Sequence, residues 1–148
     1  MLLFILTFFP LVIYNIFKEI LGRIWAKYFL IFWFFIPLFE AFGFFHFYYV
    51  KLTLRGFGEP LSYLCFLTAL LFLIKFKKHS YSVNYLNSFI FGFFLALAIG
   101  LRANILPACL VLMIFYILLN IKENRNNFFF LLLGFSLVLI MPIHNYVF

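Results

Sequence analysis

A few charged and amide side chains stand out in this chain because nearly everything around them is apolar. Arg55 and Glu59 flank a Gly-Phe-Gly stretch, and Arg102 precedes Asn104 by two residues. The planar guanidinium group of arginine matches the oxygens of a phosphate. Two arginines brought together by folding would suit a phosphate, while Glu59 would pair with Arg55 or contact a hydroxyl-rich ligand. Three further polar residues lie at or near the ends of apolar runs, namely Glu40, His144 and Asn145.

The same residues also have a purely structural interpretation. Arg55 and Glu59 would form a local ion pair, and Arg102 would extend its charged group from an apolar environment to a polar interface. His144 and Asn145 would cap the end of a helix. Both interpretations stay open on the residues alone, and the clustering on one side described below favours a binding site.

The composition indicates which solvent surrounds the chain. Of the 148 residues, 68% are hydrophobic and only 10% are charged, whereas soluble domains have about a quarter of their residues charged. Such a chain lacks the polar side chains to cover a surface in water, so we predict an integral membrane protein. The net charge of +7 then indicates orientation in the bilayer, and we expect no nucleic-acid partner.

The apolar residues fall into six segments, and these runs are long enough to cross a bilayer, which takes roughly 20 apolar residues per helix. We predict an all-α, polytopic transmembrane helix bundle forming a single domain over residues 1–148, in which the fourth and fifth helices are short. Short connections predict antiparallel neighbours. A basic loop holding Lys18, Arg23 and Lys27, a kink at Pro37 and a polar loop at Ile121–Asn127 are expected between or within the segments. The segments are Leu2–Phe17, Ile24–Phe42, Pro60–Phe76, Tyr85–Leu101, Leu106–Leu119 and Phe128–Val147.

When successive connections between the segments are assigned alternately to the two sides of the membrane, most of the basic residues fall on one side. Lys and Arg collect on the cytoplasmic side of membrane proteins, so the bias predicts a multi-pass protein of the plasma (inner) membrane with an external N-terminus. The predicted external side then holds the candidate binding residues. The cytoplasmic side receives Lys18, Arg23, Lys27, Lys75, Lys77, Lys78, Lys122 and Arg125, and the external side receives Lys51, Arg55 and Arg102.

Small residues recur at four-residue spacing in the fourth segment. Gly92, Ala96 and Gly100 share one face of a helix, and small residues let helix backbones approach closely in lipid. We predict that this small-residue seam packs inside the bundle. A dimer face is the alternative.

Residues for catalysis or metal binding are scarce. The four acidic residues are all Glu, and only Glu40 and Glu59 fall on the predicted external side as candidates for a general base. No spacing of His and Cys is typical of a metal site, so we expect no metal and no cofactor. Cys65 and Cys109 lie inside apolar runs and are interpreted as small buried hydrophobic residues.

Three stretches taken in order resemble a known family. Gly58–Tyr63 opens a leucine-rich segment with an acidic residue, Gly92–Pro107 holds a glycine-rich segment that ends in Arg102, and Met141–Phe148 holds a Pro-x-x-Asn element. Together they resemble the middle part of GT-C-type membrane glycosyltransferases, over about Ile36–Phe148. These polytopic enzymes move a sugar from a polyprenyl-phosphate carrier to an acceptor at the outer face of the membrane.

The resemblance implies roles for some residues and leaves one role unfilled. It assigns Arg102 and Arg55 to the lipid-linked phosphate and Glu59 to the sugar or acceptor. The family places an essential acidic residue, usually Asp, in its first external loop, and this chain has neither that loop nor any Asp. We therefore expect an interior piece of a longer glycosyltransferase, or a truncated or diverged member, that is inactive alone. The alternative is a non-catalytic membrane subunit or a small transporter component.

Overall fold

The chain folds into helices throughout the part that the structure describes. The computed structural model describes the backbone of residues 2–35, 59–78, 84–120 and 125–147, and the side chains of residues 7–33, 60–75, 85–119 and 126–138. The prediction of an all-α fold is confirmed over these ranges, which contain no strand. No helix within them has both the length and the hydropathy that crossing a membrane requires. The elements are α1 (Leu2–Leu21), α2 (Arg23–Phe35), α4 (Glu59–Lys78), α5 (Asn84–Leu101), the short 3-10 helix η3 (Ala103–Ile105), α6 (Leu106–Asn120) and α7 (Arg125–Val147).

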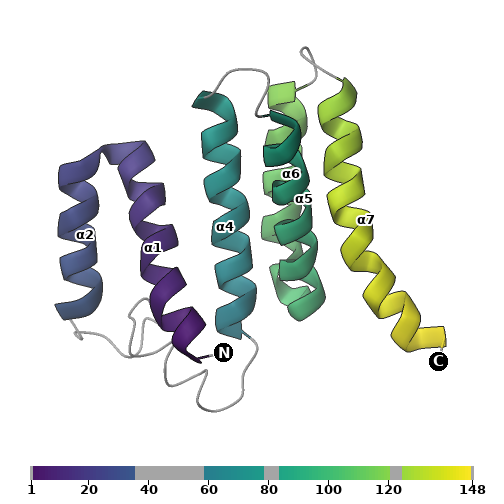
Figure 1. The fold of residues 1–148 in the computed structure, drawn as a ribbon, viewed down its shortest axis with the longest axis horizontal. Coiled ribbons are helices and arrows are strands. Elements are labelled where there is room, and N and C mark those ends of the chain that lie inside the picture. Colours follow the sequence, from purple (N-terminus) through teal and green to yellow (C-terminus); the bar gives the residue numbers. More distant parts are fainter. Residues whose placement is uncertain (1, 36–58, 79–83, 121–124, 148) are drawn as a thin grey trace.

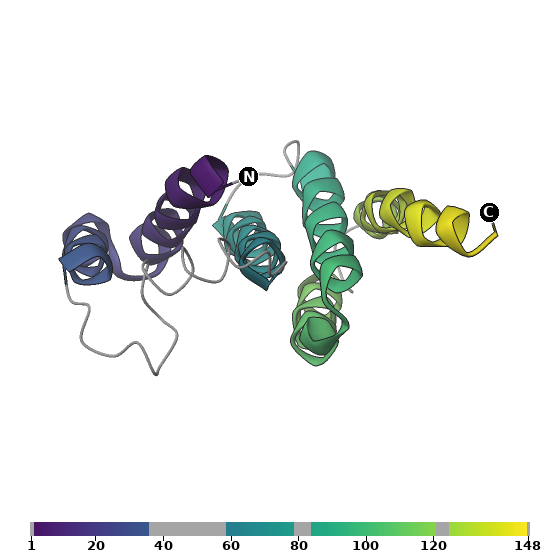
Figure 2. The same ribbon diagram turned by 90° about the horizontal axis from the view of Figure 1, so that it is seen from below.

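Five helices stand side by side in the order α2, α1, α4, α5 and α7, as Figure 1 shows, and α6 lies behind α5. Consecutive helices run in opposite directions (Figure 1), as short connections predict. One end of the row holds the α1–α2 turn and the start of α7, and is called the Gly22 end. The other holds the start of α4 and the α5–α6 junction, and is called the Arg102 end. Figure 2 views the row from below.

The turn between α1 and α2 is a single residue, Gly22, and it corrects one sequence prediction. Its φ of +93° lies in the left-handed region that glycine adopts without a steric penalty. Its N–H donates to the carbonyl of Lys18 (3.2 Å), and its own carbonyl accepts from the N–H of Ala26 (3.1 Å). The predicted basic loop is therefore wrong, because one glycine reverses the chain and leaves Lys18 in α1 and Arg23 and Lys27 in α2.

A second correction concerns the start of α7. The polar stretch Ile121–Asn127 was expected to be a loop, but α7 already begins at Arg125. Asn127 is 2% exposed, and its carbonyl oxygen lies 3.3 Å from the hydroxyl of Tyr116. The polar residues here form the first helical turn, where backbone groups lack partners within the helix. Pro37, where a kink was predicted, lies outside the described residues.

Two apolar clusters hold the helices together. The larger one joins α4, α5, α6 and α7, and it buries Cys65, Phe91 and Leu131. The smaller one joins α1, α2 and α4 around Phe9 and Trp33. Both cysteines are buried and free, which confirms their interpretation as small hydrophobic residues.

A close helix contact lies between α5 and α7, at two glycines. A Cβ atom at Gly92 would collide with the carbonyl oxygen of Leu131, and one at Gly134 would collide with the carbonyl oxygen of Phe89. Of the predicted small-residue seam, Gly92 therefore packs inside the bundle and Ala96 is buried. Gly100 is exposed, and a Cβ atom there would meet nothing within 4 Å. Gly134, which the sequence analysis did not single out, supplies the other half of the contact.

We predict that Gly92→Ala and Gly134→Ala each destabilise the folded protein by about 1–3 kcal/mol, because the backbones of α5 and α7 must move apart. The measurement is the thermal unfolding midpoint of the detergent-solubilised protein, with Gly100→Ala as the matched control. A Gly92→Ala variant as stable as the Gly100→Ala variant would contradict the close contact.

Candidate functional site

Arg102 lies in the short break between α5 and η3. Its backbone is extended, with φ −157° and ψ 109°, and its side chain is partly buried. Its N–H donates to the carbonyl of Ala98 (3.1 Å), and its own carbonyl accepts from the N–H of Ile105 (3.3 Å). Asn104 follows within η3 and is exposed. The backbone at Arg102 is thus fixed on both sides.

A second donor reaches the carbonyl of Ala98 from another helix. The Ser62 hydroxyl donates to this oxygen over 2.9 Å, and Ser62 is 1% exposed. The bond joins the first turns of α4 to the last turn of α5, next to Arg102. Two of the three stretches on which the family resemblance rests, Gly58–Tyr63 and Gly92–Pro107, are therefore in direct contact. Nothing in their sequence spacing predicted this contact.

The other predicted site residues are less fully described. Glu59 is the first residue of α4, and His144 and Asn145 lie in the last turns of α7. Both helix termini lie at the Arg102 end, although α7 ends at the far side of the row from α2 (Figure 1). The side chains of these three residues, and all of Glu40 and Arg55, lie outside the described part of the chain. A single pocket holding the whole set stays a prediction.

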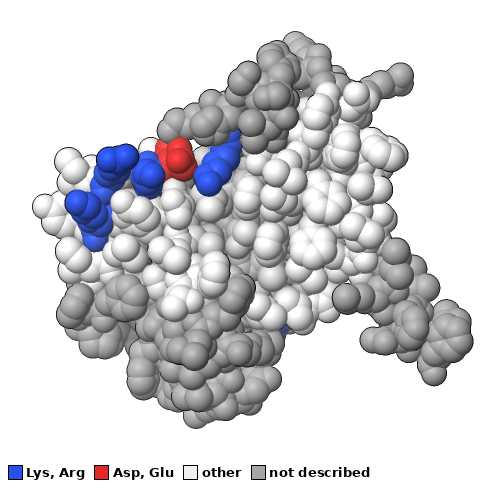
Figure 3. All heavy atoms as spheres, in the orientation of Figure 1, with Lys and Arg blue, Asp and Glu red and all other residues white. Residues whose placement is uncertain are grey.

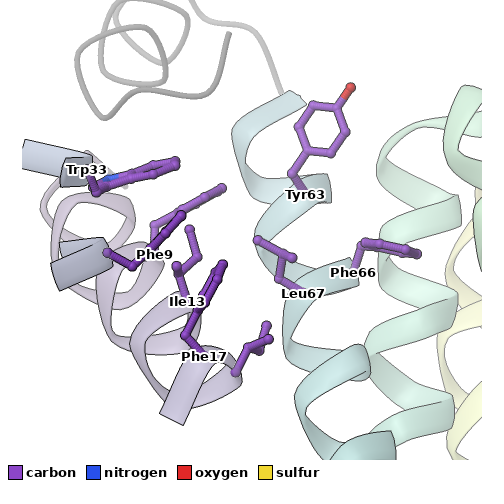
Figure 4. Close-up of a pocket in the computed structure, with 9 residues that line it drawn as sticks. Phe9, Ile13, Phe17, Trp33, Tyr63, Phe66 and Leu67 are labelled. Atoms are coloured by element: carbon purple, nitrogen blue, oxygen red, sulfur yellow. The ribbon is translucent and has the colours of Figure 1, made fainter. Parts of the chain in front are cut away.

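An apolar cleft lies between α1, α2 and α4 (Figure 4), and the sequence analysis missed it. Its volume is about 470 Å³, which is within the usual range for ligand pockets. The spacing of Phe9, Ile13 and Phe17 on one face of α1 was the available signal, but it is equally typical of ordinary core packing. Among the described residues the lining is uncharged and consists of Phe9, Ile13, Ile16, Phe17, Phe29, Trp33, Tyr63, Phe66 and Leu67.

Stacked rings form one wall of the cleft. Phe9 stacks on Trp33 with ring centroids 5.7 Å apart, and Phe17 stacks on Phe29 at 3.9 Å. These pairs join α1 to α2, and Leu67 of α4 points toward them from the opposite side (Figure 4). Aromatic side chains have few rotatable bonds and large contact areas, so this wall is shaped before any ligand arrives.

The polar atoms of the lining lie toward the Arg102 end. Among the lining residues, only Trp33 and Tyr63 have a polar side-chain atom. Trp33 is near the end of α2 and Tyr63 is near the start of α4, so both lie toward the Arg102 end. The hydroxyl of Tyr63 points out of the cleft in Figure 4. The side chains of Trp33 and Tyr63 thus form what we call the polar rim of the cleft, and the rest of its described lining, which reaches Phe17, is apolar.

A buried polar contact joins the other end of the bundle. The hydroxyl of Tyr116 on α6 lies 2.7 Å from Oγ of Ser88 on α5 and 3.3 Å from the carbonyl oxygen of Asn127 on α7. Tyr116, Ser88 and Asn127 are all buried. A buried hydroxyl is costly without a hydrogen bond, so this contact fixes how the three helices pack together.

Comparisons with known proteins add no relative to these observations. No protein-family model matches the chain, and no curated protein or solved structure matches it either. Over the described residues, no group of three or more His, Cys, Asp or Glu could hold a metal ion.

We predict that Ser62→Ala and Tyr116→Phe each lower the free energy of unfolding by about 1 kcal/mol, the usual contribution of a hydrogen bond. The matched control is Ser136→Ala, because the exposed Ser136 hydroxyl bonds only to Leu133 of its own helix. Chemical unfolding in detergent measures the effect. Equal stability of all three variants would show that the interhelical bonds contribute nothing.

Proposed function

We propose that the chain is a multi-pass integral membrane protein whose Gly22 end faces the cytoplasm. The composition supports this, and so does the outer surface of the described helices. Trp25 is 64% exposed and Leu118 is 63% exposed, and uncharged residues cover most of the described surface visible in Figure 3. Large contiguous apolar surfaces are rare on soluble monomers. The basic residues of α1, α2 and α4 gather at the Gly22 end, in agreement with the bias of Lys and Arg toward the cytoplasm.

We infer further that the protein binds a polyprenyl-phosphate-linked sugar at the outer face of the membrane, as a reduced or partial member of the GT-C-type glycosyltransferases. The observation that supports this most directly is the cleft between α1, α2 and α4, with its apolar interior and its polar rim at the Arg102 end. A long hydrocarbon chain would contact the stacked rings along the interior. Its polar head would then lie at the rim, on the predicted external side.

Arg102 is the residue proposed to bind the phosphate of this ligand. Its guanidinium group would donate paired hydrogen bonds to phosphate oxygens, and the bonds of Ala98 to Ser62 and to the Arg102 N–H hold its backbone in place. Fixing a binding residue through a rigid backbone lowers the entropy lost when the ligand binds. Glu59, at the first position of α4, is proposed to contact the sugar or the acceptor.

The family resemblance assigns no residue of this chain to the essential acidic position that transfer of the sugar needs. The family's essential acidic residue is usually Asp, and this sequence has none. The proposal is therefore binding without turnover by this chain alone. A longer protein or a second subunit would contribute the general base.

The ligand-binding prediction uses liposomes that contain the purified chain and a fluorescent polyprenyl-phosphate sugar. Leu67→Trp should weaken binding by about tenfold or more, because the larger side chain fills the cleft. Arg102→Ala should also weaken binding by about tenfold or more, since a hydrogen bond to a charged group contributes about 1.5–3 kcal/mol. The matched control is Ile114→Trp, at an exposed position of α6.

Absence of any binding, or binding that Arg102→Ala leaves unchanged, would refute the proposal. That outcome would favour the alternative, a non-catalytic membrane subunit or small transporter component. The small-residue seam of α5 was the alternative dimer face, but α7 already covers part of it, because Gly92 packs against α7. A partner would have to use another surface, and the exposed apolar residues of α6 provide one.

A further inference from the structure

Basic side chains form a row across three helices at the Gly22 end. Figure 3 shows this row over α2, α1 and α4, with one acidic side chain within it. Lys18 and Glu19 lie in the last turn of α1, Arg23 and Lys27 lie in the first turns of α2, and Lys75 lies near the end of α4. Among the side chains that the structure describes at this end, four cations and one carboxylate leave a net positive charge. Arg102 is the other basic residue whose side chain is described, and it lies at the opposite end.

The cations of the row are positioned to reach outward. Arg23 and Lys27 are exposed, and their spacing of four residues places them on one face of α2. Lys75 is partly buried, with its ammonium nitrogen 5.8 Å from the centre of the Phe72 ring. Lysine commonly lays its carbon chain along apolar surface while the charge extends into a polar layer. The row is thus a charged strip at the Gly22 end of a surface whose other described residues are mostly apolar.

Two exposed aromatic side chains lie at the same height along the helix axes as the cations of this row. Trp25 and Tyr28 of α2 are 64% and 62% exposed, and their rings meet edge to face with centroids 6.3 Å apart. In sequence they alternate with Arg23 and Lys27. Trp and Tyr favour the headgroup level of a bilayer, where an amphipathic ring contacts both apolar and polar surroundings. The aromatic residues and the cations therefore both indicate that the Gly22 end lies at the headgroup level of a bilayer.

We propose that this row, Lys18, Arg23, Lys27 and Lys75, binds the headgroups of anionic phospholipids in one leaflet of the membrane; the inference rests on the membrane location in the proposed function. Charge complementarity is the main argument, since each Lys or Arg near an anionic leaflet raises the affinity by about fivefold. The exposed Ile20 and Ile24 beside the row favour lipid over a soluble polyanion, which would leave these apolar side chains in water.

Native mass spectrometry of the full chain in a neutral detergent tests this proposal. The probes are phosphatidylglycerol and phosphatidylcholine with identical acyl chains, so that only the headgroup differs. We expect phosphatidylglycerol to bind at least tenfold more tightly. Replacing the four cations with Gln (K18Q/R23Q/K27Q/K75Q) should remove that preference. The charge-retaining variant K18R/K27R/K75R should keep it.

The salt dependence of the unmodified protein gives a second measurement that needs no variant. Raising the salt from about 0.05 M to about 0.5 M should lower the preference several-fold, because exposed charges are screened beyond a few ångströms at high salt. Equal affinity for the two lipids, or a preference that survives both salt and the Gln variant, would overturn the proposal. Both results are independent of the binding of a polyprenyl-phosphate sugar at the Arg102 end, so either proposal can fail alone.

Discussion

Close contact between helix backbones is the feature on which the rest of the structure depends. A chain with so few charged side chains has few ion pairs with which to hold its helices together, so packing and a small number of buried hydrogen bonds must do so. The small residues Gly92 and Gly134 allow α5 and α7 to approach until each glycine meets the partner backbone. The other faces of α5 contact α4 and α6. The position of α5 in turn fixes the Ala98 carbonyl and the break at Arg102.

The sequence predicted the helices well, and it failed where one residue changes the chain direction. Hydropathy located α1, α4, α5, α6 and α7 to within a few residues at each end, because apolar runs of this length are longer than typical strands. It also placed the start of α2 to within one residue, whereas the predicted end of that segment, Phe42, lies outside the described residues. It predicted a basic loop between the first two helices, but a single left-handed glycine, Gly22, makes the turn there and the basic residues belong to the helices. It also assigned Asn127 to a loop, although that residue is buried in the first turn of α7. Polar composition marks a helix terminus and a loop equally well, so it cannot distinguish them.

The candidate site was predicted less completely than the fold. The polar side chains of Arg102 and Asn104 were recognisable in the sequence, but the bond between Ser62 and Ala98 depends on how two helices are offset along their axes. The cleft was also unpredictable, because Phe9, Trp33 and Leu67 come from three helices and each would be an ordinary core residue by itself. The cleft is the space left between them, and Trp33 and Tyr63 place its polar rim toward the Arg102 end of the helices.

Photocrosslinking tests most directly whether a lipid-linked ligand occupies this cleft. A polyprenyl-phosphate analogue with a photoreactive group in its hydrocarbon chain would be irradiated in liposomes with the purified protein, and the labelled residues would be identified by mass spectrometry. Our account predicts labels on the cleft residues of α1 and α4, such as Phe17 and Leu67. Labels confined to the exposed residues of α6, such as Ile114 and Leu118, would show that the chain merely touches the surrounding lipid and would contradict the account.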